Sequence, residues 1–349
     1  GDTGTYRESY IFFAQEEEEM AKELRWAVLG TGVIANEMAQ ALEQMGKSLY
    51  AVGNRTHEKA VAFAEKYHVT KVYDDFHEMF TDPEIDIIYI TTPHNTHIEF
   101  LRQALANGKH VLCEKSITLN SDELNEALQI AEEHHVILAE AMTIWHMPLY
   151  KELWEIVSSG ELGKVQMIQL NFGSYKEYDM NNRFFNINLA GGALLDIGVY
   201  ALSLMRSFMA ETPDQVMSQV RFAPTGTDEQ ASIILMNKEQ QMAAITLSMH
   251  SKQPKRAMIS CEKGYIEIME YPRADKAIIV DAASGAVTPV EAGETKRALE
   301  YEMRDMEEAV QSGDVSRMQM PFTGDVMNIM TDLRKNWGLV YPEESGKTE

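Results

Sequence analysis

The chain has 349 residues and a net charge of −23 at pH 7, with 45% hydrophobic and 24% charged residues. This length suits about two domains of roughly 150 residues each, and the balance is that of a globular protein. The acidic charge repels phosphate backbones, so we expect no nucleic-acid partner. No apolar run approaches the ~20 residues needed to cross a bilayer, so we expect no membrane either.

The start of the chain and its cysteines indicate the compartment. The apolar run at residues 10–14 is too short for the core of a secretory signal, and glutamates follow it. Cys113 and Cys261 lie in apolar stretches, where a pair of reduced core thiols is favoured over a disulfide. We therefore expect a cytoplasmic protein.

Residues 1–22 are expected to form an N-terminal extension. Residues 1–19 lack a core pattern, and the glutamates at 16–19 stand directly before Met20. Four consecutive Glu codons are purine-rich, like a bacterial ribosome-binding site. We therefore interpret residues 1–19 as translated upstream sequence or an expression remnant, with Met20 as the native start. A genuine acidic arm is the alternative.

Strands and helices alternate through the first half of the chain. Nearly continuous apolar runs predict strands at 25–30, 48–54, 71–75, 85–93, 109–115 and 136–142. Amphipathic runs between them predict helices at 34–46, 56–69, 76–82, 97–108 and 121–135, the last with Ser121 as N-cap. This rhythm favours a parallel, doubly wound Rossmann sheet, and we assign it to residues 23–145.

The pattern changes after about residue 150. A helix (149–159) and a strand (164–173) precede the run GGALLDIGVY (191–200), which reads as a helix. Strand-like runs then follow one another at 215–223, 230–237, 241–250, 255–262, 264–270 and 276–282, before helices at 297–313 and 322–338. We expect an α+β domain over residues 146–349 with an open, mostly antiparallel sheet, its last helix packing back on the Rossmann domain. The fold class is α/β. An amphipathic open sheet favours cover by another subunit, in a homodimer or homotetramer.

A glycine-rich turn joins the first expected strand to the first helix. Gly30, Gly32 and Ala35 have the G-x-G-x-x-A spacing of a dinucleotide-binding loop. Gly30 allows the tight turn, Gly32 lets a pyrophosphate approach the backbone, and Ala35 permits close helix packing. Val33 and Ile34 open the helix, whose free N–H groups favour phosphates.

The end of the second expected strand indicates which dinucleotide binds. NAD sites of this kind usually carry an acid there, for the ribose 2′-hydroxyl. Here the strand is followed by Asn54, Arg55 and Thr56, without a carboxylate. An arginine fork suits a 2′-phosphate, so we predict NADP, with NAD as the alternative.

Several segments together resemble the glucose-fructose oxidoreductase / inositol dehydrogenase / MocA family. They are the glycine loop, TTPHNTH (91–97), CEKS (113–116), GGALLDIGVY and LRKNWGLVYP (333–342), in the family's order. The resemblance covers roughly residues 22–343. It implies a dinucleotide-binding domain followed by an open antiparallel sheet domain, in agreement with the pattern described above.

Three residues are the candidate catalytic set. Lys115 stands at the end of the fifth expected strand, where ligands of doubly wound sheets bind, and Asp196 and Tyr200 share one helix face because they are four apart. The resemblance implies that Lys115 binds a substrate oxygen and tunes the acid/base group. Tyr200 replaces the family histidine, as in the branch that resembles dimeric dihydrodiol dehydrogenase, and Asp196 would hold the lysine and substrate hydroxyls. Ser116 departs from the family's proline. The structural alternatives are that Lys115 is an ordinary charge at the end of a strand, that Asp196 is an aspartate at the start of a helix, and that Tyr200 is a packed tyrosine.

Further candidates follow from the same resemblance. It implies that the cofactor's ribose and nicotinamide are lined by Thr92, Pro93, Asn95, His97, Glu114 and Lys115. By position in the chain, Arg183 precedes the glycine pair and is expected to reach the substrate or close the cleft. Trp145 and His146 follow the last expected strand and are expected to wall the substrate pocket. No metal is expected, because HNTH (94–97) has no third ligand group nearby.

The most favoured function is an NADP-dependent oxidoreductase. It would move a hydride between the nicotinamide and a secondary alcohol carbon of a sugar, cyclic polyol or trans-dihydrodiol. A non-catalytic dinucleotide-sensing regulatory protein of the same fold is one alternative. An enzyme that retains its cofactor and recycles it between two substrates is another. Side chains on the sheet domain would select the substrate, and spacing alone does not place them.

Overall fold

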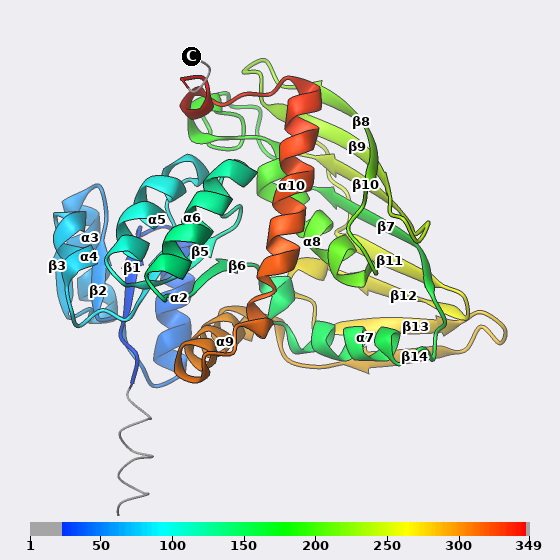
Figure 1. The fold of residues 1–349 in the computed structure, drawn as a ribbon, viewed down its shortest axis with the longest axis horizontal. Coiled ribbons are helices and arrows are strands. Elements are labelled where there is room, and N and C mark those ends of the chain that lie inside the picture. Colours follow the sequence, from blue (N-terminus) through cyan, green and yellow to red (C-terminus); the bar gives the residue numbers. More distant parts are fainter. Residues whose placement is uncertain (1–22, 347–349) are drawn as a thin grey trace, which may run out of the picture.

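A computed structural model describes residues 23–346 (Figure 1). The expected N-terminal extension, and with it the interpretation of residues 1–19, lies outside the described residues. The first sheet has the order β3-β2-β1-β4-β5-β6, and every neighbouring pair is parallel. Its strands are β1 (Trp26–Leu29), β2 (Ala51–Gly53), β3 (Lys71–Tyr73), β4 (Ile87–Ile90), β5 (His110–Glu114) and β6 (Leu138–Ala141). This confirms the predicted doubly wound sheet.

Helices connect these strands, as the periodicity predicted. They are α2 (Val33–Gln44), α3 (His57–Tyr67), α4 (Phe76–Thr81), α5 (His97–Ala106) and α6 (Ser121–Glu133). The expected N-cap of α6 is wrong by one residue. The side chain of Asn120 accepts from the N–H of Glu123 at 2.9 Å. The hydroxyl of Ser121, the first helical residue, instead donates to Asn328 on another helix.

The second sheet has eight strands in the order β14-β13-β12-β11-β7-β10-β9-β8. All neighbouring pairs are antiparallel except β7 and β10, which are parallel. The strands are β7 (Val165–Gly173), β8 (Gln215–Phe222), β9 (Asp228–Met236), β10 (Met242–Ser248), β11 (Arg256–Cys261), β12 (Gly264–Met269), β13 (Lys276–Asp281) and β14 (Val287–Glu291). The predicted open, mostly antiparallel sheet is confirmed. The edge strand β14 was missed, because it is short, exposed and interrupted by Pro289.

Four further helices join the two sheets. They are α7 (Pro148–Ser158), α8 (Val199–Phe208), α9 (Ala298–Ser312) and α10 (Met320–Trp337). Figure 1 shows α10 running between the eight-stranded sheet and the helices of the first sheet, where it contacts α8 on one side and α6 and β6 on the other. Helix α9 contacts α2. The C-terminal helices therefore fix the second sheet beside the parallel one.

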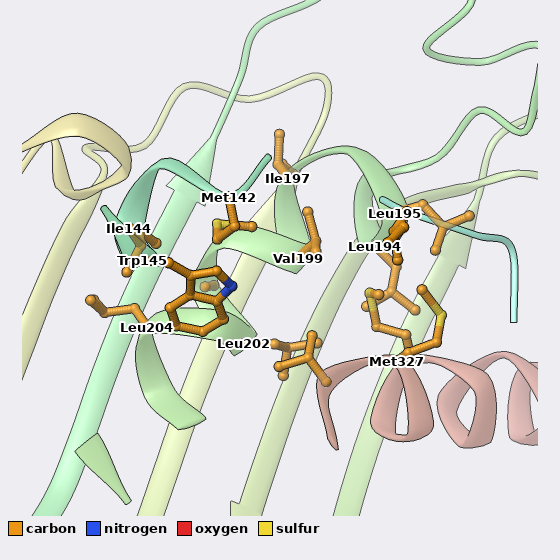
Figure 2. Close-up of a cluster of buried hydrophobic side chains, with 14 of the residues drawn as sticks. Met142, Ile144, Trp145, Leu194, Leu195, Ile197, Val199, Leu202, Leu204 and Met327 are labelled. Carbon is orange, nitrogen blue, oxygen red and sulfur yellow. The ribbon is translucent and has the colours of Figure 1, made fainter. Parts of the chain in front are cut away.

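The run GGALLDIGVY continues into α8 at the centre of the core. Its apolar side chains lie with those of the turn after β6 and of α10, as Figure 2 shows for Met142, Ile144, Trp145, Leu194, Leu195, Ile197, Val199, Leu202, Leu204 and Met327. The segment Ile187–Phe208 is long enough to cross a membrane and contains an 18-residue window of mean hydropathy 1.5, but 72% of that window is buried inside the protein. It therefore has the character of a core helix.

The outer face of the eight-stranded sheet keeps apolar side chains in contact with solvent. In the described chain the helices α8 and α10 cover the other face (Figure 1). Met217 is 73% exposed and Ile234 50% exposed. Other exposed members of this outer face are Met167, Met242 and Met269.

Candidate active site

Two adjoining cavities lie at the carboxyl ends of the parallel strands. The outer cavity, of about 880 Å³, is lined by the turns after β1, β2 and β4. The inner cavity, of about 240 Å³, is lined by the turns after β4 and β5 and by the GGALLDIGVY segment. Both cavities are lined by Thr91, Thr92, Pro93 and Leu189, so they form one continuous site. Ligands of doubly wound sheets bind at this edge.

The glycine loop forms one wall of the outer cavity. Gly30 has φ +107°, and a Cβ there would lie 2.3 Å from the Thr91 hydroxyl oxygen. A Cβ at Gly32 would meet nothing within 4 Å, so this stretch of backbone is open to a ligand. Helix α2 begins at Val33 without a side-chain cap, which leaves its first N–H groups for an anion. Ala35 is fully buried and lets α2 pack closely.

The far end of the outer cavity is cationic. It is lined by the side chains of Asn54, Arg55, Thr56, Lys59 and Lys66. The amide of Asn54 donates to the carbonyl of Thr56 at 3.1 Å and so shapes the turn that carries Arg55. The open glycine backbone, the uncapped helix and this cationic end together fit a dinucleotide. The glycine backbone and the helix start match its pyrophosphate, and the cationic end favours anionic groups.

Lys115, Asp196 and Tyr200 meet in the inner cavity. Lys115 directly follows β5, and its Nζ donates to the Asp196 carbonyl at 2.6 Å and to its Oδ1 at 3.3 Å. The same Nζ lies 4.8 Å from the centroid of the Tyr200 ring. Asp196 stands in a π-helical turn, Leu194–Gly198, that leads into α8. The structure thus brings together the three residues that the sequence singled out.

The charges of these three groups are set by burial and by each other. Burial alone would lower the pKa of Lys115, but Asp196 and Tyr200 raise it overall. Burial opposes the ionisation of Asp196, but the Lys115 charge holds its pKa below the usual value. Burial raises the pKa of Tyr200, and Lys115 offsets part of this shift. At neutral pH the set is therefore an ammonium, a carboxylate and a neutral phenol, which can donate a proton to a carbonyl oxygen.

Ser116 ties the lysine turn to the π-helical turn. It is fully buried, and its hydroxyl donates to the Leu195 carbonyl at 2.6 Å. The proline expected by resemblance at this position has no hydroxyl to make this bond. The departure from the family pattern therefore adds a direct link between the Lys115 turn and the segment that carries Asp196.

The glycine pair of GGALLDIGVY makes room for an aspartate from the second sheet. Gly192 has φ +128°, and a Cβ there would lie 2.0 Å from an Asp228 side-chain oxygen. Asp228 is fully buried and accepts from the Leu194 N–H at 2.7 Å, while the Tyr341 hydroxyl donates to the Gly191 carbonyl at 2.7 Å. Burial raises the pKa of Asp228 to about 7. These two supports were not predicted, although Tyr341 lies in the closing motif LRKNWGLVYP.

Comparison with known proteins assigns the family. Residues 24–142 match the model of the oxidoreductase family with an NAD-binding Rossmann fold, and residues 150–267 match the GFO/IDH/MocA C-terminal domain. The chain is 31% identical to a trans-1,2-dihydrobenzene-1,2-diol dehydrogenase of Xenopus tropicalis, over 74% of this chain and 78% of that protein. The chain belongs to the GFO/IDH/MocA oxidoreductase family. The enzyme of the same name from Xenopus laevis is 29% identical over 91% of this chain and 99% of its own.

Solved structures share the fold of this GFO/IDH/MocA oxidoreductase. A 3-ketoreductase from Actinomadura kijaniata, in complex with NADP and TDP-benzene, aligns with a TM-score of 0.81 at 20% identity, over 90% of this chain and 98% of that one. A levoglucosan dehydrogenase in complex with NADH and levoglucosan aligns at 0.78 and 16% identity, over 89% and 97%. The family model and the dehydrogenase relatives show that the chain is an NAD(P)-binding enzyme of the dehydrogenase and reductase class.

Most of the other expected cofactor residues line the two cavities. Thr92 and Pro93 line both, and Ile34 and Glu114 line the inner one. Asn95 lines the outer cavity, and its amide donates to the Asn188 carbonyl at 3.0 Å. Val33 is 80% exposed at the start of α2 and lines neither.

Glu114 and His94 add two groups of altered acidity to the inner cavity. The Tyr89 hydroxyl donates to Glu114, and burial raises the pKa of this carboxyl. Burial, with the nearby Lys115 charge, lowers the pKa of His94 to about 3, so its imidazole is neutral. His94 was not singled out from the sequence, although it lies in the same TTPHNTH segment as the residues that were.

His97 does not line either cavity, which corrects the expectation that it contacts cofactor. It is fully buried, with Nε2 2.8 Å from the Thr92 carbonyl oxygen. Its Nδ1 lies 3.0 Å from the Ser116 carbonyl oxygen and 3.1 Å from that of Ile117. His97 thus joins the turns after β4 and β5. It positions the cofactor wall and the Lys115 turn from behind.

Trp145 and His146 are also placed differently from the expectation that they wall the substrate pocket. Trp145 is fully buried in the cluster of Figure 2, and its Nε1 donates to Thr323 at 3.3 Å. His146 is 1% exposed, with Nδ1 2.7 Å from Asp305 Oδ2. After β6 the chain turns into the apolar core rather than toward the cavities. Arg183, the third expected substrate residue, does line the inner cavity.

Proposed function

We propose that the chain is an NADP-dependent oxidoreductase that interconverts a secondary alcohol and a ketone on a sugar, cyclic polyol or trans-dihydrodiol. The observation that carries this proposal is the Lys115 ammonium, bonded to Asp196 and lying over the Tyr200 ring, in a cavity continuous with the dinucleotide-shaped one. The names of the dihydrodiol dehydrogenases support the substrate class. When bound, the nicotinamide supplies or accepts the hydride.

The chain's own residues supply orientation and the proton. Tyr200 donates its phenolic proton to the carbonyl oxygen during reduction and takes the hydroxyl proton during oxidation. Lys115 stabilises the phenolate and binds the substrate oxygen, because its charge lies beside the ring. Asp196 holds the ammonium in place and accepts from a neighbouring substrate hydroxyl. His97 and Ser116 fix the turn that carries Lys115.

The choice of NADP rests on Arg55. Within residues 23–346, Arg55 and Arg183 are the arginines without a carboxylate partner. Arg55 faces the outer cavity together with Lys59 and Lys66. A free guanidinium beside two ammonium groups suits the dianionic 2′-phosphate of NADP, with which it can make bidentate bonds.

The proposed function is tested with the purified full-length protein in two steps. Fluorescence titrations with NADPH and NADH should give tighter binding of NADPH. Turnover is then followed by nicotinamide absorbance with NADP⁺ and a set of sugars, cyclic polyols and trans-dihydrodiols. Tighter NADH binding would overturn the NADP proposal. NADPH binding without turnover of any alcohol or ketone would favour a dinucleotide-sensing protein instead.

We further propose that the outer face of the eight-stranded sheet pairs with a second copy of the chain. The exposed Met217 and Ile234 are paired on adjacent antiparallel strands, and a monomer would leave both apolar side chains in water. Light scattering should give a dimer or tetramer for the native chain. Ile234→Asp should shift it toward monomer, and a monomeric native chain would contradict this assignment.

A further inference from the structure

We propose that the substrate carries an anionic group, a carboxylate or a phosphate, which the guanidinium of Arg183 binds in the inner cavity. This inference rests on the proposed function, because it names the substrate class of the same site. The inference gives the substrate a second contact in the cavity, in addition to the contact at the reacting carbon. The reacting hydroxyl or carbonyl lies at Lys115 and Tyr200, and the anion lies at Arg183.

Arg183 is the cation without a carboxylate partner among the described groups that line the inner cavity. Lys115 is paired with Asp196 at 3.3 Å. Glu114 accepts from the Tyr89 hydroxyl and makes no ion pair with Arg183, and burial raises the pKa of its carboxyl. The pKa of His94 is lowered to about 3, so this ring carries no charge. The guanidinium of Arg183 remains without a carboxylate, and an anion that entered the cavity would balance it.

This lack of a partner is unusual in such an acidic chain. The net charge is −23, and the other arginines of residues 23–346, Arg55 excepted, have carboxylate partners within 4 Å. Both exceptions line the site, one in each cavity. We assign the Arg55 charge to the cofactor phosphate. The same reasoning assigns the Arg183 charge to the other ligand, the substrate.

A second cation lies on the same aromatic ring. The Arg183 Cζ is 4.7 Å from the centroid of the Phe184 ring, and the Lys176 Nζ is 4.3 Å from it. Phe184 itself lines the inner cavity, and Lys176 has no carboxylate partner among the described residues. Two cations against one ring repel each other, and this repulsion falls when an anion binds near both. The ring also restricts the guanidinium, which reduces the entropy lost on binding.

The backbone around Arg183 fixes its position relative to the catalytic residues. The carbonyl of Phe184 accepts from the N–H of Gly192 at 2.9 Å, and the side chain of Asn182 accepts from the N–H of Phe184 at 2.9 Å. Gly192 is four residues before Asp196. An anion beside Asp196 would be repelled by its carboxylate, so the favourable position is at the guanidinium, with the reacting carbon toward Lys115. A guanidinium binds a carboxylate or phosphate through two parallel bonds, which a neutral hydroxyl does not offer.

Matched neutral and anionic compounds test this inference. With saturating NADP⁺, kcat/KM is measured for D-glucose, D-glucuronate and D-glucose 6-phosphate. The same is done for trans-cyclohexane-1,2-diol and its 4-carboxylate. Calorimetry on the NADPH-loaded protein gives the affinity for each compound independently of turnover. We expect at least one anionic member to be favoured over its neutral partner by about tenfold or more. Comparison of D-glucuronate with D-glucose 6-phosphate shows whether a carboxylate or a phosphate is preferred.

Arg183→Gln should lower this anionic-to-neutral ratio by roughly 10- to 100-fold, the usual range for hydrogen bonds to a charged group. Arg183→Lys keeps the charge without the planar fork and should give an intermediate ratio. Arg102→Gln, on the outer surface of α5 and paired with Glu126 at 2.8 Å, is the matched control and should leave the ratio unchanged. The NADPH affinity of each variant checks that the fold and the outer cavity are intact.

Two results would overturn the inference. One is that no anionic compound is preferred over its neutral partner. This includes a preference for the neutral compounds and the case in which no compound is bound or turned over. The other is that Arg183→Gln keeps the preference. The proposed function is judged separately, by NADPH binding and by turnover of any member, neutral or charged. Turnover of neutral compounds alone would therefore leave the proposed function standing and remove the anionic substrate.

Discussion

Replacing Lys115 by methionine removes the charge that lies 4.8 Å from the Tyr200 ring centroid. At this separation and an effective dielectric constant of about 20, two unit charges interact by ~3.5 kcal/mol. The phenolate that forms during the reaction loses this stabilisation, and the Asp196 carboxylate beside it loses its ion-pair partner. Since about 1.4 kcal/mol is a factor of ten, we expect alcohol oxidation to slow by at least ~10²-fold.

The pH dependence separates this role from a structural one. Burial holds the pKa of Tyr200 above its usual value, and Lys115 lowers it in part. Oxidation needs the phenolate, so its kcat/KM should rise about tenfold per pH unit through neutral pH and level off only near the tyrosine pKa. Without Lys115 that pKa rises further, so the plateau moves to higher pH. Reduction, which needs the phenol, should persist to higher pH.

The assay is kcat/KM against pH, in both directions, for the native enzyme, Lys115→Met and Lys115→Arg. Arginine keeps the charge and should restore the position of the plateau, if not the full rate. Lys276→Met, at an exposed position on β13, is the control. A loss smaller than tenfold in Lys115→Met would refute the electrostatic reasoning. So would a loss without any movement of the pH profile.

Four other changes test separate parts of the site. Tyr200→Phe removes the hydroxyl but keeps the ring that stacks on Phe172, so turnover should fall at least ~10²-fold at unchanged NADPH affinity. Near-native turnover would contradict the acid/base role of Tyr200. Arg55→Gln should weaken NADPH binding and leave NADH binding nearly unchanged, and equal losses for both would contradict the phosphate assignment. His97→Ala removes the single N–H that the neutral ring can donate to the three buried carbonyls around it, and it should lower the free energy of unfolding by about 1–3 kcal/mol in urea titrations. An unchanged unfolding midpoint would contradict this positioning role. Burial raises the pKa of Asp228 to about 7, so the folded state loses stability as pH rises from about 4 to 7, by ~1.4 kcal/mol per pH unit. Asp228→Asn should therefore flatten the fall of Tm with pH over this range. Parallel plots of Tm against pH for the native chain and the variant would refute this.

Local patterns explain why much of the fold could be predicted. The strand–turn–helix context of Gly30 and Gly32 needs only neighbouring residues, and the structure forms this loop with the open backbone that was expected. Apolar strand runs separated by amphipathic helices predicted the order of elements in the parallel sheet. The spacing of Asp196 and Tyr200 predicted one shared face, and both line the inner cavity although a π-helical turn precedes α8.

The parts that were missed depend on contacts distant in sequence. Asp228 bonds to Leu194 across 34 residues, and Tyr341 bonds to the glycine pair across 150. Neither partner can be found from spacing along one element. Trp145 was placed wrongly because its nearness to the end of β6 in sequence suggested the cavity, whereas its large apolar ring is buried in the core.

The central claim is that Tyr200, with Lys115 and Asp196, exchanges the proton in an NADP-linked alcohol–ketone reaction. The most direct measurement is turnover of the purified chain and of Tyr200→Phe with NADP⁺ and the neutral and anionic alcohols, alongside their NADPH affinities. We predict turnover by the native chain and a loss of at least ~10²-fold in the variant, with equal NADPH affinity. Equal turnover by both proteins, or none by a native chain that binds NADPH, would contradict the claim.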